Sequence, residues 1–176
     1  MDTQKAILTR RSIRKYTDKI ISEDLIRNLI EAGLHAPSAR NIQPWHFIVV
    51  TDRVILDELA IAHPYGKMLR QATLAILVCG DKQLQDVEGY IVQDCSAVTQ
   101  NILLSVHSYG LGAVWLGMFP REERIKAVSK LLEIPGHILP VSLISIGYPD
   151  EHKEAPDRYK TEKIHLNKFG VLSFEF

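Results

Sequence analysis

The stretch EGYIVQDCSAVTQNILLSVHSYGLGAVWLGMFP, residues 88–120, carries the clearest structural pattern in the chain. Its apolar side chains recur at three- or four-residue steps at Ile91, Cys95, Val98, Ile102 and Val106. This spacing predicts one helix from Glu88 to Tyr109, about 33 Å long. Gly110 predicts the end of the helix, because glycine readily adopts the left-handed conformation that closes helices. The apolar run that follows predicts a strand from Ala113 to Phe119.

Outward from this stretch, three further apolar runs predict strands that are buried on both faces: Phe47 to Val50, Leu74 to Val78 and Val141 to Ile146. Helices separate the strands. Capping and periodicity predict helices at Thr3 to Arg10, after Ser22 with an end between Gly33 and Pro37, and at Arg121 to Leu132. The terminal VLSFEF, residues 171–176, alternates like an edge strand. Together these elements predict an α+β fold with a mixed sheet.

Composition limits the possible partners. The 176 residues contain no repeat, low-complexity tract or linker, which predicts one domain over residues 1–176. The 21 basic and 21 acidic side chains cancel, so neither nucleic acid nor a membrane surface is an expected partner.

Cys79 and Cys95 lack metal or CxxC spacing and are expected to be buried free thiols. With no signal-like N-terminus and no membrane-length apolar run, we expect a cytoplasmic protein.

The first candidate site is RRSIRKY, residues 10–16, which follows the N-terminal helix. Guanidinium groups offer planar donor pairs that match a phosphate, and Ser12 adds a hydroxyl. This cluster is therefore a candidate phosphate site. A solvated basic turn is the alternative on these residues alone.

The second candidate site is PSARNIQPW, residues 37–45. Its amides and hydroxyl provide both donors and acceptors, as a heteroaromatic ring with carbonyl and imino groups requires. A simple cap-and-turn is equally consistent with these residues. The third candidate is Leu116 and Gly117, where glycine allows a flat ligand to approach the backbone closely.

Four segments in the same order resemble FMN-dependent nitroreductases: RRSIRKY, PSARNIQPW, QDCSAVTQN with GLGAVWLG, and IGYP with APDRYKTEKIHLNK. The resemblance covers nearly the whole chain. It implies a nitroreductase-like fold with a central, mixed but mostly antiparallel sheet flanked by helices. It also implies an intertwined homodimer with composite active sites, and FMN as the cofactor.

The resemblance also assigns expected roles to residues. Arg10, Ser12 and Arg14 would hold the phosphate and ribityl chain, Arg158 would reach the same phosphate, and Arg11 would contribute partly through its backbone. Pro37, Ser38, Asn41 and Gln43 would line the flavin from the other subunit. Leu116 and Gly117 would direct backbone amides at the redox-active nitrogen, and Lys67 would face the pyrimidine end. Ala39 and Trp115 complete the expected contacts. Two departures are Ala39, where a serine is frequent, and Arg40, where a small residue is common.

The implied activity is hydride transfer from NADH or NADPH, followed by reduction of a nitroaromatic, a quinone or a similar small acceptor in a ping-pong cycle. The sequence has no GxGxxG fingerprint to identify the donor, and no triad or metal-ligand spacing is present. No side chain is therefore expected to be catalytic, and no metal is expected. His35, His46 and His107 are expected to be core or boundary residues. The alternatives are a flavin-dependent dehalogenase, a flavin-cleaving enzyme on the same fold, or a non-enzymatic FMN-binding protein.

Overall fold

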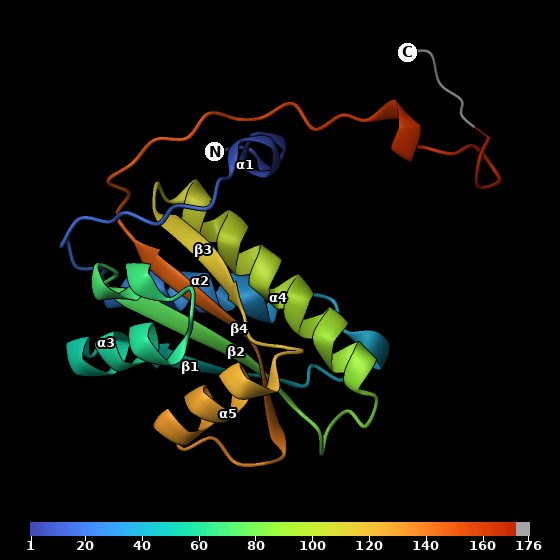
Figure 1. Ribbon diagram of the computed structural model, residues 1–176. Coiled ribbons are helices and arrows are strands. Elements are labelled where there is room, and N and C mark those ends of the chain that lie inside the picture. Colours follow the sequence, from blue (N-terminus) through green and yellow to red (C-terminus); the bar gives the residue numbers. More distant parts are fainter. Residues whose placement is uncertain (172–176) are drawn as a thin grey trace.

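The computed structural model describes residues 1–171 and places a four-stranded antiparallel sheet between two layers of helices (Figure 1). The strands lie in the order β1 (Trp45–Val50), β2 (Leu74–Asp81), β4 (Ile138–Gly147) and β3 (Gly112–Gly117). All three strand pairs are antiparallel. Within the described residues, parallel pairing occurs only at the isolated bridge between Ser12 and Ala113. The expected α+β class with a mostly antiparallel sheet is confirmed.

Helices alternate with the strands along the chain, as the sequence predicts. They are α1 (Thr3–Thr9), α2 (Glu23–Leu34), α3 (Arg53–Ala62), α4 (Glu88–Ser108) and α5 (Glu122–Leu131), with short 3-10 turns η1 (Ala39–Asn41), η2 (Lys67–Arg70) and η3 (Thr161–Lys163). No bounds were predicted for α3. Its N-cap is Asp52, whose carboxylate accepts a hydrogen bond from the Ile55 N–H at 3.0 Å. None of the helices in residues 1–171 is long and apolar enough to cross a membrane.

Strand β2 is buried on both faces, which explains its continuous apolar sequence. Its alternate residues enter two separate hydrophobic clusters. Leu74, Ile76 and Val78 pack in the cluster that includes α2 and α4. Ala75, Leu77 and Cys79 pack in the cluster that includes α3 and α5. The sheet therefore separates an α2/α4 layer from an α3/α5 layer.

Strand β3 forms one edge of the sheet, and the segment after α1 lies along it. The Ile13 N–H donates to the Ala113 carbonyl at 2.9 Å. Backbone groups of alternate residues in an antiparallel strand point to the same side. The backbone of Gly117, four residues beyond Ala113, consequently faces the same open edge.

Beyond β4 the chain runs past α1 and away from the sheet as an extended arm, residues 149–171 (Figure 1). Most residues of the arm beyond Ala155 are exposed. Of the predicted edge strand at 171–176, residues 172–176 lie outside the described residues.

Candidate active site

A cavity of about 650 Å³ lies at the end of β3, between α3 and α5. It gathers five of the residues predicted to bind the cofactor: Arg14, Lys67, Trp115, Leu116 and Gly117. Arg124 also lines it, and no acidic side chain does. Arg14, Lys67 and Arg124 thus give the cavity three cationic side chains and no carboxylate among the described residues, which favours an anionic ligand. Within the described residues, no group of three His, Cys, Asp or Glu side chains is placed to hold a metal ion.

Gly117 leaves open space beside this cavity. A Cβ built on Gly117 would meet no heavy atom within 4 Å outside its chain neighbours. The carbonyl of Gly117 accepts two hydrogen bonds, from His63 Nε2 at 3.1 Å and from Arg124 Nη1 at 2.8 Å. The guanidinium of Arg124 also lies 5.3 Å from the centre of the Tyr65 ring. The strand end is thus held by side chains from both neighbouring helical segments.

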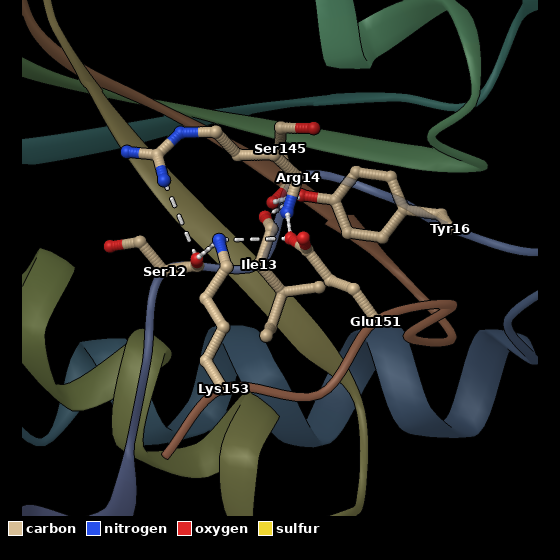
Figure 2. A network of polar contacts seen from close by, with 7 residues as sticks. All are labelled: Ser12, Ile13, Arg14, Tyr16, Ser145, Glu151 and Lys153. Atoms are coloured by element: carbon tan, nitrogen blue, oxygen red, sulfur yellow. Dashed lines mark hydrogen bonds and ion pairs between the residues drawn. The ribbon is translucent and has the colours of Figure 1, made fainter. Parts of the chain in front are cut away.

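The backbone of residues 12–16 is fixed by the start of the C-terminal arm and by the core (Figure 2). Lys153 Nζ donates to the Ser12 carbonyl at 2.8 Å and pairs with Glu151 at 3.0 Å. Although burial pushes the pKa of Glu151 upward, hydrogen bonds from the Arg14 N–H and from Lys153 hold it below its usual value. The single O–H of Tyr16 is shared between the carbonyls of Ile13, at 2.7 Å, and Ser145, at 3.1 Å. Figure 2 shows the Arg14 side chain extending away from Glu151, and its guanidinium lines the cavity.

Arg10, Arg11 and Arg158 form a second cationic group. Burial lowers the pKa of Arg10, and the positive charges of Arg11 and Arg158 lower it further. Arg11 uses its guanidinium on the backbone carbonyls of Leu8, Arg10 and Glu154. A phosphate would relieve this like-charge repulsion, so the donor set fits a phosphate-bearing ligand. Arg10, Ser12 and Arg158 do not line the cavity of Arg14, and Arg11 lines a separate one of about 340 Å³.

The loop with Pro37, Ser38, Ala39, Asn41 and Gln43 does not line the Arg14 cavity of its own chain. Arg40, Asn41 and Gln43 have left-handed φ values of 55°, 55° and 54°. Internal bonds hold the loop, from the Gln43 N–H to Ser38 Oγ at 2.9 Å and from Gln43 Nε2 to Asn41 Oδ1 at 3.1 Å. Asp94 of α4 accepts a hydrogen bond from the Ala39 N–H at 3.0 Å. The loop is therefore preformed on the α2/α4 layer.

The histidines correct the sequence analysis. His35 and His46 are exposed rather than core or boundary residues, and His107 is half-buried. His35 follows the last residue of α2, and His46 occupies an outward-facing position of β1. The apolar residues beside these two histidines in sequence therefore did not predict whether the histidines are buried. His63 is 1% exposed and was not singled out, nor was Arg124. His63 and Arg124 contact Gly117 only in the folded chain, so no local sequence pattern identifies either residue.

Comparisons with known proteins agree with this geometry. A sequence model of the Nitroreductase family matches residues 7–63 and 57–148. A relative from Methanothermobacter thermautotrophicus, provisionally named NADH dehydrogenase/NAD(P)H nitroreductase, is 47% identical over 96% of this chain and 88% of its own.

Two solved structures share the fold. The Parabacteroides distasonis structure, whose name is the same, also provisional, has a TM-score of 0.91 at 42% identity, covering 95% of this chain and 98% of the other. A provisionally named nitroreductase from Desulfovibrio desulfuricans, solved in complex with FMN, has a TM-score of 0.83 at 35% identity, covering 96% and 98%. With a family match over most of its length and relatives of this similarity, the chain belongs to the Nitroreductase family.

Proposed function

We propose that this chain is an FMN-dependent NAD(P)H oxidoreductase that reduces small electrophilic acceptors such as nitroaromatics or quinones. The observation that carries the proposal is the cavity in which Arg14, Lys67 and the open backbone edge at Gly117 meet without any acidic side chain. When bound, FMN supplies the chemistry by accepting a hydride from the nicotinamide and passing electrons to the acceptor. The protein then has to position the flavin and nicotinamide rings and to compensate the negative charge of the cofactor.

The residues present suit each part of this cofactor. The phosphate would be held by Arg14, which lines the cavity, together with Arg10 and Arg158, which lie outside it, and the repulsion between Arg10 and Arg158 favours an anion beside them. Lys67 would face the pyrimidine end of the ring. The space beside Gly117 would admit the flat ring without displacing protein atoms.

We further propose that the active site is shared between two copies of the chain. The cavity walls belong mainly to the α3/α5 layer, whereas the 37–43 loop is anchored to α4 by Asp94. The sheet lies between the two layers, so the loop of one chain does not reach the cavity of that chain. A second copy would supply the loop.

Donor and acceptor would use the same cavity in turn. Two such molecules do not occupy one flavin face together, so the acceptor would enter only after the oxidised nicotinamide has left. Steady-state rates with varied NAD(P)H and menadione should therefore give parallel double-reciprocal lines. Converging lines would exclude the shared cavity.

The absorption spectrum of the purified protein tests the proposal most directly. We expect flavin bands that are bleached anaerobically by NADH or NADPH and restored by menadione, and the faster of the two nucleotides identifies the donor. A colourless protein that does not bind added FMN would overturn the proposal. A yellow protein that neither nucleotide bleaches would indicate flavin storage instead of catalysis.

A further inference from the structure

Two side chains from different helical segments meet at one backbone carbonyl beside the cavity. His63 directly follows α3, and Arg124 lies in the first turn of α5. Both donate to the carbonyl of Gly117, the last residue of the edge strand β3. We use the term Gly117 clamp for His63, Arg124 and this carbonyl.

The clamp fixes a complete peptide group. The Gly117 carbonyl and the Met118 N–H belong to the same peptide, and the Met118 N–H donates to the Val141 carbonyl of β4 at 3.2 Å. One end of the peptide plane is thus held by β4, and the other by His63 and Arg124. Glycine would otherwise allow this strand end a wide range of backbone angles. The Gly117 N–H belongs to the preceding peptide, on the side where Leu116 pairs with Leu143 of β4, so the two held peptides together fix the backbone conformation of Gly117.

The surroundings of His63 determine which ring nitrogen donates. His63 Nδ1 accepts a hydrogen bond from the Tyr65 N–H at 3.2 Å, so the neutral ring carries its proton on Nε2, which faces Gly117. The ring is buried, and the groups that face it or line the same cavity are Arg124, Tyr65, Lys67 and Arg14. No carboxylate in the cavity favours a charged imidazole. The neutral Nε2–H form is therefore the one that the site retains.

We propose that His63 and Arg124 are positioning residues that hold the Gly117–Met118 peptide, and thereby the backbone conformation of Gly117 at the place where the flavin ring would approach. This inference rests on the proposed FMN-dependent function. Neither side chain needs to touch the reacting atoms. The clamp sets the geometry of the backbone that the ring would meet, and it ties that geometry to both α3 and α5.

The test compares four variants. His63→Phe removes the donor but keeps a ring, whereas His63→Gln keeps an N–H donor at similar reach. Arg124→Leu removes the second donor, and it also tests the clamp if His63→Phe does not fold. Arg121→Leu is the matched control, because Arg121 is an exposed cation at the start of α5 whose side chain does not bond Gly117.

The first measurement is hydrogen exchange of the Met118 amide in the apoprotein, which needs no flavin and no turnover. We expect exchange at least about three- to ten-fold faster in His63→Phe and Arg124→Leu, the worth of one ordinary hydrogen bond, and near wild type in His63→Gln and Arg121→Leu. Nitrogen chemical shifts of His63 should also show the Nε2–H tautomer.

The second measurement is FMN affinity by fluorescence titration. The dissociation constant should rise by roughly three- to ten-fold in His63→Phe and Arg124→Leu, with recovery in His63→Gln. Unchanged Met118 exchange in folded His63→Phe and Arg124→Leu, or His63→Gln as impaired as His63→Phe, would overturn the clamp. Absence of FMN binding by the wild-type protein would instead overturn the proposed function, and the exchange data would still judge whether the clamp holds the peptide.

Discussion

At the scale of single residues, Arg14 of the cavity and Arg158 of the C-terminal arm have little part in holding residues 1–171 together. The Arg14 guanidinium makes only a long contact of 3.5 Å, to the Ser12 carbonyl, and Arg158 is exposed. Neither side chain is used to stabilise the core. Within residues 1–171 neither guanidinium forms a salt bridge, whereas Arg53 bonds two carbonyls and Asp57.

Replacement of Arg14 or Arg158 by alanine should therefore weaken FMN binding without unfolding the protein. We expect a loss of about 1.5 to 3 kcal/mol each, roughly ten- to a hundred-fold in dissociation constant, the usual worth of a hydrogen bond to a charged group. Fluorescence titration with FMN and riboflavin measures it, with Lys130→Ala as an exposed control. Equal affinity of the wild-type protein for riboflavin and FMN would remove the phosphate role.

Gly117→Val tests the open space at the strand end. A Cβ there meets no neighbour, so the folded apoprotein should keep its melting temperature. The side chain would fill the space that the flavin ring needs, so bound flavin and activity should both be lost. A variant that keeps full cofactor content would show that the ring does not approach this backbone.

His63 makes stability depend on pH. Burial and the nearby Arg124 lower its pKa below the ordinary 6.5, although the hydrogen bond to Gly117 opposes this. As pH falls through about 6.5, the unfolded chain takes up a proton that the folded chain resists, so the free energy of unfolding falls. His107 acts with the same sign, because burial, Arg10 and Arg11 lower its pKa.

Urea unfolding at pH 7 and about pH 5.5 measures the effect. The loss of stability on acidification should be smaller in His63→Gln than in the wild-type protein, with the remainder due to His107. Equal losses in the two proteins would show that His63 does not resist protonation.

At the scale of elements, the predictions that depended on local pattern agree with the structure. The apolar steps from Ile91 to Val106 predicted the long helix to within one residue of α4, and the Leu74 to Val78 run predicted the start of β2 and its first five residues. Short-range periodicity and capping decide such elements. The contacts of His63 and Arg124 with Gly117 join residues 54 and seven positions apart, and only tertiary packing creates them. The roles of the 37–43 loop and of Arg158 remain predictions.

The loop of residues 37–43 depends on α4 through Asp94. The Asp94 side chain is 5% exposed and accepts the Ala39 N–H. Asp94→Ala should lower the free energy of unfolding by about 1 to 3 kcal/mol, because the Ala39 N–H loses a charged acceptor. Urea unfolding measures this, with the exposed Asp86→Ala as control. A loss no larger than that of the control would show that the loop does not depend on this bond.

At the scale of the whole molecule, the two halves of the proposed site lie in different helical layers, so each site would need two chains. Arg14→Ala and Asn41→Ala should each lower activity alone. When the two variants are unfolded and refolded together, a mixed dimer has one site with both lesions and one with neither. About half of wild-type activity per mixed dimer should return. If each site used one chain, every site would keep a lesion and no activity would return.

Assembly itself gives a separate prediction. The apolar side chains Ile7, Leu8, Leu34 and Tyr90 of α1, α2 and α4 are exposed, and we expect a second copy to cover them. Obligate interfaces bury roughly 2,000 Å² or more. Light scattering of the active protein should therefore give twice 19.9 kDa. A mass of one chain in the active, flavin-loaded protein would exclude the shared site.

The division of the core by β2 has a consequence for how such proteins diverge. The cavity residues His63, Pro64, Tyr65, Lys67, Met68 and Arg124 all lie outside the cluster of Ile76 and α4. We therefore expect that substitutions which change the proposed acceptor can arise in the cavity without changing the packing of the α2/α4 layer. Among descendants of a common ancestor, we expect substrate range to change faster than quaternary structure.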